Sequence, residues 1–404
     1  MSGRGGPSPL ERALMNKTGK IKTLAAFAFA LACLCVPLLS RGQMSAPTSY
    51  TPTPWRTSKP FEEAGYVGRE ACAKCHEQES ASQHTTAMGR AIETVADSRV
   101  LSTHPRMAFR AGAYTFQIVR QGAESTYSVT DGTRTVSAPI LYAFGQGKAG
   151  QTYVFKLDGS FYESRLSYYK EIDGLDYTIG YERKAPPTLD EALGRRIAGD
   201  ETRSCFQCHG TAAVNGTNLQ LEHLVPGVSC ESCHGPGRDH VAAMQARDLK
   251  DKHIFNPARM SPDELSQEFC GSCHRSAEQV LSNKALQGLH SVRFQPYRLF
   301  TSRGHEPFDP RMSCTACHDP HDNPRKDEAF YDSKCFACHR SQASLRSPQV
   351  AKQEADADRD AKPCPVAQKA CASCHMPKVE LPGSHFKFTD HRIRIARPDE
   401  PFPN

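Results

Sequence analysis

Residues 314–339 read CTACHDPHDNPRKDEAFYDSKCFACH and contain two copies of a Cys-x-x-Cys-His pattern. Five more copies occur in the chain, and in each the histidine directly follows the second cysteine. The cysteine pairs are Cys72 and Cys75, Cys205 and Cys208, Cys230 and Cys233, Cys270 and Cys273, Cys314 and Cys317, Cys335 and Cys338, and Cys371 and Cys374; the histidines are His76, His209, His234, His274, His318, His339 and His375. One motif therefore accounts for most of the 17 cysteines.

This spacing is typical of c-type haem attachment. Two thiols separated by two residues reach the two vinyl-derived carbons on one edge of a porphyrin, and the adjacent histidine ligates the iron. A zinc site needs two such pairs per metal and gives no reason for a histidine after every pair. A disulfide across two residues is usually redox-active and not structural. We therefore expect seven covalently attached haem c groups, bound by the motif cysteines and ligated by the motif histidines.

Ten further histidines can supply the second axial ligand, which is enough for every haem to be bis-histidine. A six-coordinate iron has no position for a substrate and suits electron transfer. Five of the ten lie close to a motif or near the end of the chain, and we expect these to be ligands, the alternative for each being a surface or propionate-contacting residue: His84, His223, His240, His321 and His391. His290, His305 and His385 remain open, whereas His104 and His253 are expected to be structural or exposed.

The N-terminal segment indicates export. Lys17, Lys20 and Lys22 precede the apolar run TLAAFAFALACLCVPLL at 23–39, so residues 1–42 are expected to be a signal peptide. The alternative is an uncleaved anchor. Most of the formal net charge of +6 lies in this segment, and the remaining chain lacks the basic face that nucleic-acid binding needs. We expect a periplasmic or outer-surface location and no nucleic-acid partner.

Composition and periodicity divide the rest of the chain. We expect a Pro/Ser/Thr-rich tether at 43–60, a first haem segment at 61–104, a haem-free β-rich region at 105–200 and a hexahaem region at 201–404. The alternation of apolar and polar residues predicts antiparallel strands at 113–120, 125–130, 151–157 and 160–169, with turns at Asp131-Gly132 and Asp158-Gly159.

Six of the motifs are crowded between residues 205 and 375. So dense a stretch cannot build a conventional core from side chains, and we expect the haems to form it, with short helices and loops around them. The predicted fold class is α+β with much irregular structure, combining this haem-cored region with a small antiparallel sheet. The chain without haem is expected to be largely unfolded. Cys364 lies in a solvated connector at 346–364 and receives no role.

Several segments resemble exported multihaem cytochromes of the cytochrome c-554/c-prime-like family. They are CAKCHEQESASQHTTAM at 72–88, YAFGQGKAGQTYVFKLDGSFYESRLSYY at 142–169, GVSCESCHGPGRDH at 227–240, RFQPYRL at 293–299, CTACHDPH at 314–321, CASCHMPK at 371–378 and FTDHRI at 388–393. The resemblance covers most of residues 61–395. It implies a periplasmic or surface electron carrier with bis-histidine haems, and it supports His84, His240, His321 and His391 as ligands.

The expected function is electron transfer between exported or membrane-bound redox proteins, by the chain alone or as a homo-oligomer or filament. The alternative is a multihaem oxidoreductase with one open haem that acts on a small nitrogen or sulfur compound. Ammonia-forming nitrite reductases use a lysine-ligated haem at Cys-x-x-Cys-Lys, and this motif does not occur in the sequence. The number of spare histidines also favours the carrier.

Overall fold

The computed structural model describes residues 61–305, 309–339, 369–397 and 400–403, together with Arg56, Lys59 and Ala367, but not the side chain of Cys338. The expected signal peptide, most of the expected tether and Cys364 lie outside the described residues. In the described part of the chain, no helix combines the length and apolar character needed to cross a bilayer.

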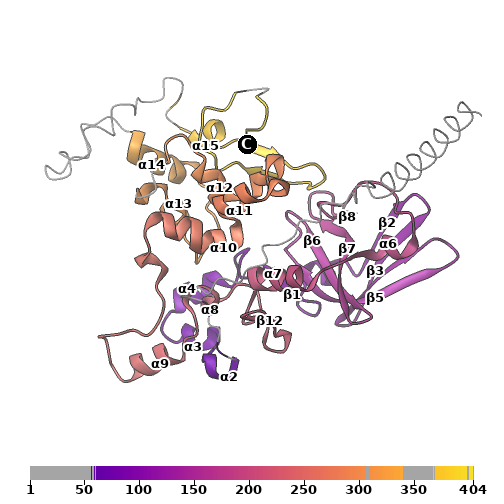
Figure 1. The fold of residues 1–404 in the computed structure, drawn as a ribbon, viewed down its shortest axis with the longest axis horizontal. Coiled ribbons are helices and arrows are strands. Elements are labelled where there is room, and N and C mark those ends of the chain that lie inside the picture. Colours follow the sequence, from indigo (N-terminus) through magenta and orange to yellow (C-terminus); the bar gives the residue numbers. More distant parts are fainter. Residues whose placement is uncertain are drawn as a thin grey trace, which may run out of the picture. The chain divides into compact units, whose positions relative to one another are not determined.

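The alternating segments form a nine-stranded antiparallel sheet. Its strands are β1 (Ile92–Thr94), β2 (Arg106–Ala111), β3 (Tyr114–Gln121), β4 (Glu124–Thr130), β5 (Thr135–Phe144), β6 (Gln151–Leu157), β7 (Ser160–Tyr169), β8 (Gly174–Tyr177) and β9 (Gly194–Arg196). Strands β2 to β8 pair in chain order, β1 adds to β5 and β9 adds to β7 (Figure 1). The four predicted strands are thus confirmed as β3, β4, β6 and β7.

Local chemistry sets the tight turns of this sheet. Between β6 and β7, Asp158 and Gly159 have φ of 47° and 75°, the pair of positive values that a two-residue hairpin turn requires. Between β4 and β5, the Asp131 Oδ1 atom accepts hydrogen bonds from the backbone N–H groups of Thr133 at 2.9 Å and Arg134 at 2.7 Å. Both predicted turns therefore connect neighbouring strands.

The sheet curls around its own apolar core. Phe109 of β2 packs edge-on against Tyr177 of β8, with ring centroids 5.6 Å apart, so strands at opposite ends of the pairing order meet. The buried cluster inside includes Phe116, Tyr153 and Leu166 and is closed by the short helix α6 (Leu189–Leu193). This region has a conventional side-chain interior.

The remaining elements are short, and many end at a haem motif. The helices are α2 (Phe61–Ala64), α3 (Arg69–Ala73), α4 (Glu77–Gln83), α5 (Arg99–Thr103), α7 (Gly199–His209), α8 (Cys230–His234), α9 (Arg238–Gln245), α10 (Gly271–His274), α11 (Ala277–Ser282), α12 (Gln295–Phe300), α13 (Cys314–Cys317), α14 (Glu328–His339) and α15 (Cys371–His375). Short 3-10 helices are η1 (Leu221–His223), η2 (Pro257–Arg259), η4 (Lys284–Leu286), η5 (Gly288–Arg293) and η6 (Pro310–Met312), and η3 (Glu264–Cys270) is π-helical.

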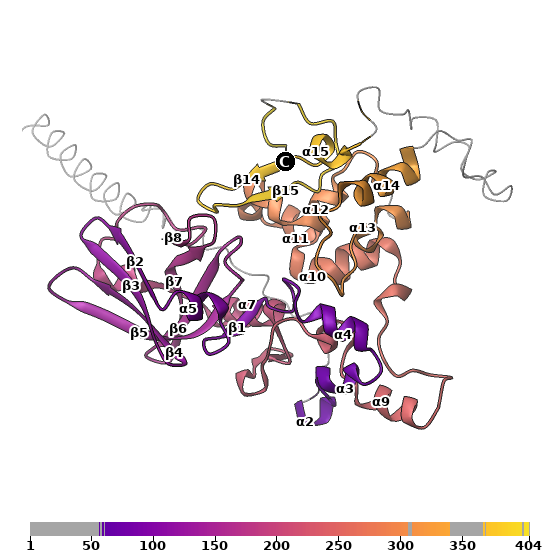
Figure 2. The same cartoon turned by 180° about the vertical axis from the view of Figure 1, so that it is seen from behind.

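Three small strand pairs complete the fold. They are β10 (Gly210–Thr211) with β13 (Val225–Pro226), β11 (Val214–Asn215) with β12 (Asn218–Leu219), and β14 (Lys378–Glu380) with β15 (Lys387–Thr389). Segments far apart in sequence lie side by side, since α3 contacts α8 (Figures 1 and 2). The predicted α+β class with much irregular structure is confirmed.

The sequence EQESASQHTTAMGRAIETV at 77–95 predicts a helix that carries His84, and this prediction is wrong beyond Gln83. Helix α4 ends there, because the hydroxyls of Thr85 and Thr86 hydrogen-bond back to the carbonyls of Ser82 and Gln83 at 2.7 Å. The chain then turns and enters β1.

Candidate haem sites

A single cavity of about 5060 Å³ connects all seven motifs. The histidine and at least one cysteine of each motif line it. Ligand pockets in proteins usually measure about 300–1000 Å³, so this space has room for several large groups. Thiols and imidazoles directed at one apolar-walled space are the donors that a covalently bound haem requires, and the residues fit the predicted cofactor.

Each motif folds locally as a helical turn. In the first, the N–H groups of Cys75 and His76 donate to the Cys72 carbonyl at 3.1 and 2.9 Å. Residues three and four apart lie on the same face of such a turn. The two thiols and the imidazole of a motif therefore point the same way before any haem is attached.

Hydrogen bonds set the tautomer of six imidazoles among the expected iron ligands. In each, Nδ1 lies against a backbone carbonyl: His84 with Ser80 at 3.0 Å, His209 with Ala91 at 3.0 Å, His234 with Phe255 at 2.9 Å, His240 with Lys252 at 2.6 Å, His375 with Arg394 at 2.9 Å and His391 with Thr389 at 3.0 Å. A carbonyl can only accept, so Nδ1 carries a proton, and in the neutral ring Nε2 then keeps its lone pair. This is the tautomer that an iron ligand needs.

Three motif histidines face a histidine from another segment. The ring centroids are 6.4 Å apart for His76 and His240, 6.1 Å for His234 and His321, and 6.2 Å for His318 and His391. Two nitrogen–metal bonds of about 2 Å, plus about 1 Å from each nitrogen to its ring centre, separate two axial imidazoles by about 6 Å. The spacing of the three pairs matches an iron between the rings.

Burial keeps several of these imidazoles neutral. Loss of solvation lowers the pKa of His209, His234 and His318, and it lowers the pKa of His391 to about 4. A neutral imidazole is the form that binds iron. These side chains are thus in the ligating state at neutral pH.

The other two expected distal ligands lie elsewhere. His84 follows α4 and is exposed, with Nδ1 against the Ser80 carbonyl. The ring of His223 stacks on Phe61 with centroids 4.0 Å apart, and its Nε2 lies 3.4 Å from Glu62. Among the described residues neither ring is paired with a motif histidine.

Three of the remaining histidines have a ring nitrogen in contact with a carboxylate. His104 Nε2 lies 2.9 Å from Asp173, and His385 Nε2 lies 2.6 Å from Asp176. His253 Nδ1 lies 3.5 Å from Asp251 on the surface. His290 is exposed, and the His305 ring packs beside Phe300. An imidazole nitrogen held by a carboxylate is not available to iron without breaking that contact.

The sequence interpretation missed Glu231, which lies between the cysteines of the third motif and is buried. Its carboxylate accepts hydrogen bonds at 2.9 Å from the backbone N–H groups of Val67, Gly68 and Gly237. It thereby ties the third motif to the segment before the first. The quoted CESCHGPG element contained this residue, but local spacing does not reveal a partner more than 160 positions away.

Asp332 has a similar role in the C-terminal part. This α14 residue accepts from the N–H groups of Ala370 at 2.7 Å and Cys371 at 2.8 Å. It satisfies the free amides at the start of α15. The sixth motif, at the end of α14, and the seventh, on α15, are thus fixed to each other.

Comparison with known proteins shows similarity to cytochromes that carry several haems. The family model for cytochrome c554 and c-prime matches residues 180–235. Cytochrome c-554 of Nitrosomonas europaea is 30% identical over 27% of this chain and 48% of its own length. The multiheme cytochrome MtrA of Shewanella baltica is 25% identical over 52% of this chain and 57% of its own length. The dissimilatory sulfite reductase MccA of Wolinella succinogenes is 27% identical over 41% of this chain and 24% of its own length.

The chain thus spans between a quarter and somewhat more than half of these curated relatives. Among solved structures, the outer cell wall cytochrome OcwA aligns with 81% of this chain and 79% of its own, at 16% identity and a TM-score of 0.42. The predicted resemblance and the covalent haem cofactor are confirmed by the family and relatives that match. The chain is a multihaem c-type cytochrome similar to the cytochrome c554 and c-prime family.

Proposed function

We propose that this protein is an exported heptahaem cytochrome that carries electrons between redox proteins of the periplasm or outer cell surface. The observation that supports it most is the set of three histidine pairs at the spacing of two axial ligands. A bis-histidine iron has no position for a substrate and changes its charge by one electron with little rearrangement.

The residues that would hold the haems are the seven cysteine pairs and the seven motif histidines. His240, His321 and His391 would complete the first, third and fifth sites, and we assign His84 to one of the remaining ones. His223 is assigned to another, where ligation would require its Nε2 to leave Glu62, 3.4 Å away. The haem supplies one-electron chemistry when bound. The protein's share is to orient the imidazoles through their Nδ1 hydrogen bonds and to exclude water from the iron.

The proximity of cysteines from different motifs supports an order for the haems. Four pairs of thiols from different motifs lie close enough for one to shift the pKa of the other: Cys72 with Cys230, Cys208 with Cys273, Cys270 with Cys314, and Cys335 with Cys371. The Cys233 thiol is also close enough to Cys273, and that of Cys317 to Cys335, for their charges to interact. The order is therefore first, third, fourth, fifth, sixth and seventh, with the second joined at the fourth.

Both ends of this order are accessible. Cys75 of the first motif and Cys374 of the seventh are exposed, whereas the other described motif cysteines are partly covered. Electrons can therefore enter at one end and leave at the other, with exported or membrane-bound proteins as donor and acceptor. The fourth motif is the junction through which any path from the second must pass.

Electron paramagnetic resonance of the oxidised protein tests the proposal, combined with optical spectra of the reduced protein with and without carbon monoxide. We expect low-spin signals throughout and no shift on addition of carbon monoxide. A high-spin ferric signal with carbon monoxide binding would reveal an open iron and contradict a pure carrier.

The second candidate is an oxidoreductase acting on a small nitrogen or sulfur compound. It is favoured by the similarity to a protein named as a dissimilatory sulfite reductase. Sulfite, nitrite and hydroxylamine, added to any high-spin form, would then shift its spectrum and be turned over.

A further inference from the structure

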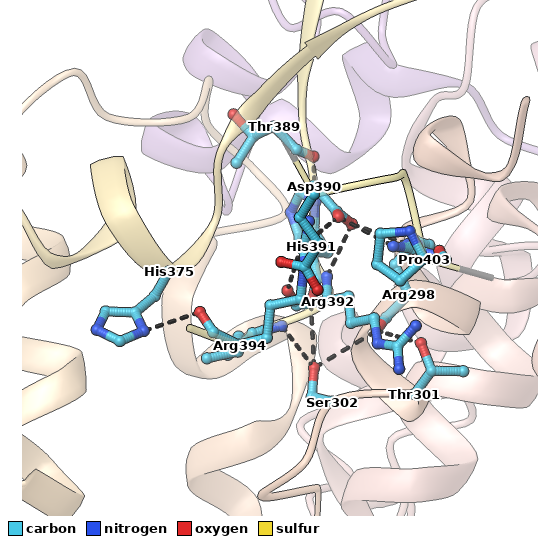
Figure 3. A network of polar contacts seen from close by, with 12 residues as sticks. Arg298, Thr301, Ser302, His375, Thr389, Asp390, His391, Arg392, Arg394 and Pro403 are labelled. Carbon is cyan, nitrogen blue, oxygen red and sulfur yellow. Dashed lines mark hydrogen bonds and ion pairs between the residues drawn. The ribbon is translucent and has the colours of Figure 1, made fainter. Parts of the chain in front are cut away.

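The segment that carries His391 is held by an ion pair with no exposed surface. Arg298, on α12, donates from Nε to Asp390 Oδ1 at 2.8 Å and from Nη2 to Oδ2 at 2.9 Å, and both side chains are 0% exposed (Figure 3). A guanidinium and a carboxylate joined by two parallel bonds have one favoured arrangement. Asp390 immediately precedes the histidine that faces His318 across the cavity.

Further contacts close the network around this pair. Asp390 Oδ2 accepts from Arg394 Nη1 at 2.7 Å, and Oδ1 accepts from the Arg392 N–H at 3.0 Å. Arg298 also donates from Nη1 to the Pro403 carbonyl at 2.7 Å, and its guanidinium lies 4.4 Å from the centre of the Phe402 ring. The two buried charges are therefore satisfied from several sides.

The end of α12 holds the backbone of His391 as well. Ser302 Oγ accepts from the Ile393 N–H at 2.8 Å and lies 3.3 Å from the His391 carbonyl, to which it donates (Figure 3). Nδ1 of His391 donates to the Thr389 carbonyl. The backbone on both sides of this histidine and its ring orientation are thus fixed by α12 and by its own strand end.

We propose that Arg298 and Asp390 are positioning residues that hold His391 as the distal ligand of the fifth haem. Two buried charges are costly unless each finds its partner, so displacement of the segment is opposed by the loss of the whole network. The arrangement confines the imidazole beside His318, where its Nε2 would be available to the iron of the haem that His318 would hold. The inference rests on the proposed bis-histidine ligation and assigns a function to the RFQPYRL and FTDHRI segments.

The test compares His391→Ala, Arg298→Gln and the double variant in the full-length, haem-loaded protein. Electron paramagnetic resonance measures the high-spin ferric fraction, and haem content is measured alongside. His391→Ala should convert roughly one haem in seven to high spin. Arg298→Gln should produce the same signal in part of the molecules, and the double variant should show no more than His391→Ala alone. Added imidazole should return each signal to low spin.

Arg165→Gln is the matched control. Arg165 is also a buried arginine, but it donates to the carbonyls of Lys184 and Glu191 at 3.2 Å within the sheet region. Arg165→Gln should leave the spin state of the haems unchanged. If Arg298→Gln lowers haem content, Asp390→Asn replaces it, because it keeps the size of the side chain while weakening the pair, and the same signal is expected.

The outcomes distinguish ligation by His391 from the positioning role of Arg298 and Asp390. If His391→Ala stays low-spin, the assigned ligation is wrong and the positioning role falls with it. If His391→Ala becomes high-spin while Arg298→Gln and Asp390→Asn match the parent, the ligation stands and the positioning role is refuted. Additive signals in the double variant would place the effect of Arg298 at another haem and also refute it.

Discussion

The sheet region, formed by β1 to β9, and the haem region, the described residues 205–305, 309–339 and 369–397, bury different kinds of interior. The sheet encloses packed aromatic and aliphatic side chains such as Phe116, Tyr153 and Leu166. In the haem region the described apolar cluster around α11 and α12 is small, with Val280 and Tyr297 among its members, and the large cavity passes between the motifs instead. One region is filled by its own side chains, and the other surrounds space of the size that cofactors need.

This difference has a consequence for stability. Burial of apolar surface supplies most of the driving force for folding, at roughly 25 cal/mol per Å². In the sheet region the buried apolar surface belongs to side chains. In the haem region most of it has to come from the macrocycles that the cysteines bind. The two regions should therefore respond differently to loss of a haem and to loss of a side chain.

The largest effect is expected when the fourth haem is removed, by the double variant Cys270→Ala and Cys273→Ala. Its cysteines lie close enough to those of the second and fifth motifs to shift their pKa values, so the haem region should open and become sensitive to limited proteolysis while the sheet stays intact. The matched control is Cys371→Ala with Cys374→Ala at the exposed end, which should open only the C-terminal segment. Equal cleavage patterns in the two variants would contradict the central position of the fourth haem.

A core truncation in the sheet should act in the opposite way. Phe116→Ala removes a fully buried ring and should lower the free energy of unfolding of the sheet by about 3–5 kcal/mol. Denaturant titration followed by circular dichroism measures this, while the haem absorption band reports the other region and should keep its midpoint. Ser137→Ala, at an exposed position of β5, is the control. A matching shift of the haem band would show that the two regions unfold together.

The smallest effect concerns a link between the two regions. The buried Asp176 carboxylate of β8 receives hydrogen bonds from His385, between β14 and β15, at 2.6 Å and from Arg183 at 2.7 Å. Burial alone would raise the pKa of Asp176, but these hydrogen bonds outweigh it and the pKa is lowered. The link therefore stabilises the fold above the ordinary aspartate pKa of about 3.9 and is lost as the pH falls through the lower folded value.

Asp176→Asn should remove this acid dependence and weaken the attachment of the hairpin by about 1 kcal/mol, a modest amount because Arg183 is largely exposed. Hydrogen exchange of residues 378–389, followed from neutral pH down to pH 3, measures it. Unchanged exchange in the variant at neutral pH would mean that the hairpin is held by other contacts.

The sequence was most informative where a function requires fixed local spacing. The seven motifs are read directly, because two thioethers and one iron ligand need residues at set positions on one helical turn. Strands β3, β4, β6 and β7 were predicted because alternation has a period of two. Strands β2, β5 and β8 were missed, since Pro139, Gly174 and weakly alternating segments blur that pattern.

Contacts between distant segments could not be predicted in this way. Which histidine faces which motif depends on residues such as His240 and His76, more than 160 positions apart. The roles of Glu231, Asp332 and the Arg298–Asp390 pair depend likewise on long-range hydrogen bonds that leave no periodic signal. The number of haems, the domain boundaries, the signal peptide, and ligation by His84 and His223 stay predictions.

Hydrogen–deuterium exchange of the haem-loaded protein and of the same chain made without haem attachment tests the central claim most directly. We predict that the amides of β2 to β8 are protected in both forms, and that those of residues 205–305, 309–339 and 369–397 are protected only when the haems are bound. Equal protection of these three segments in the two forms would show that the haem region folds on its side chains alone, and would contradict a haem-built interior.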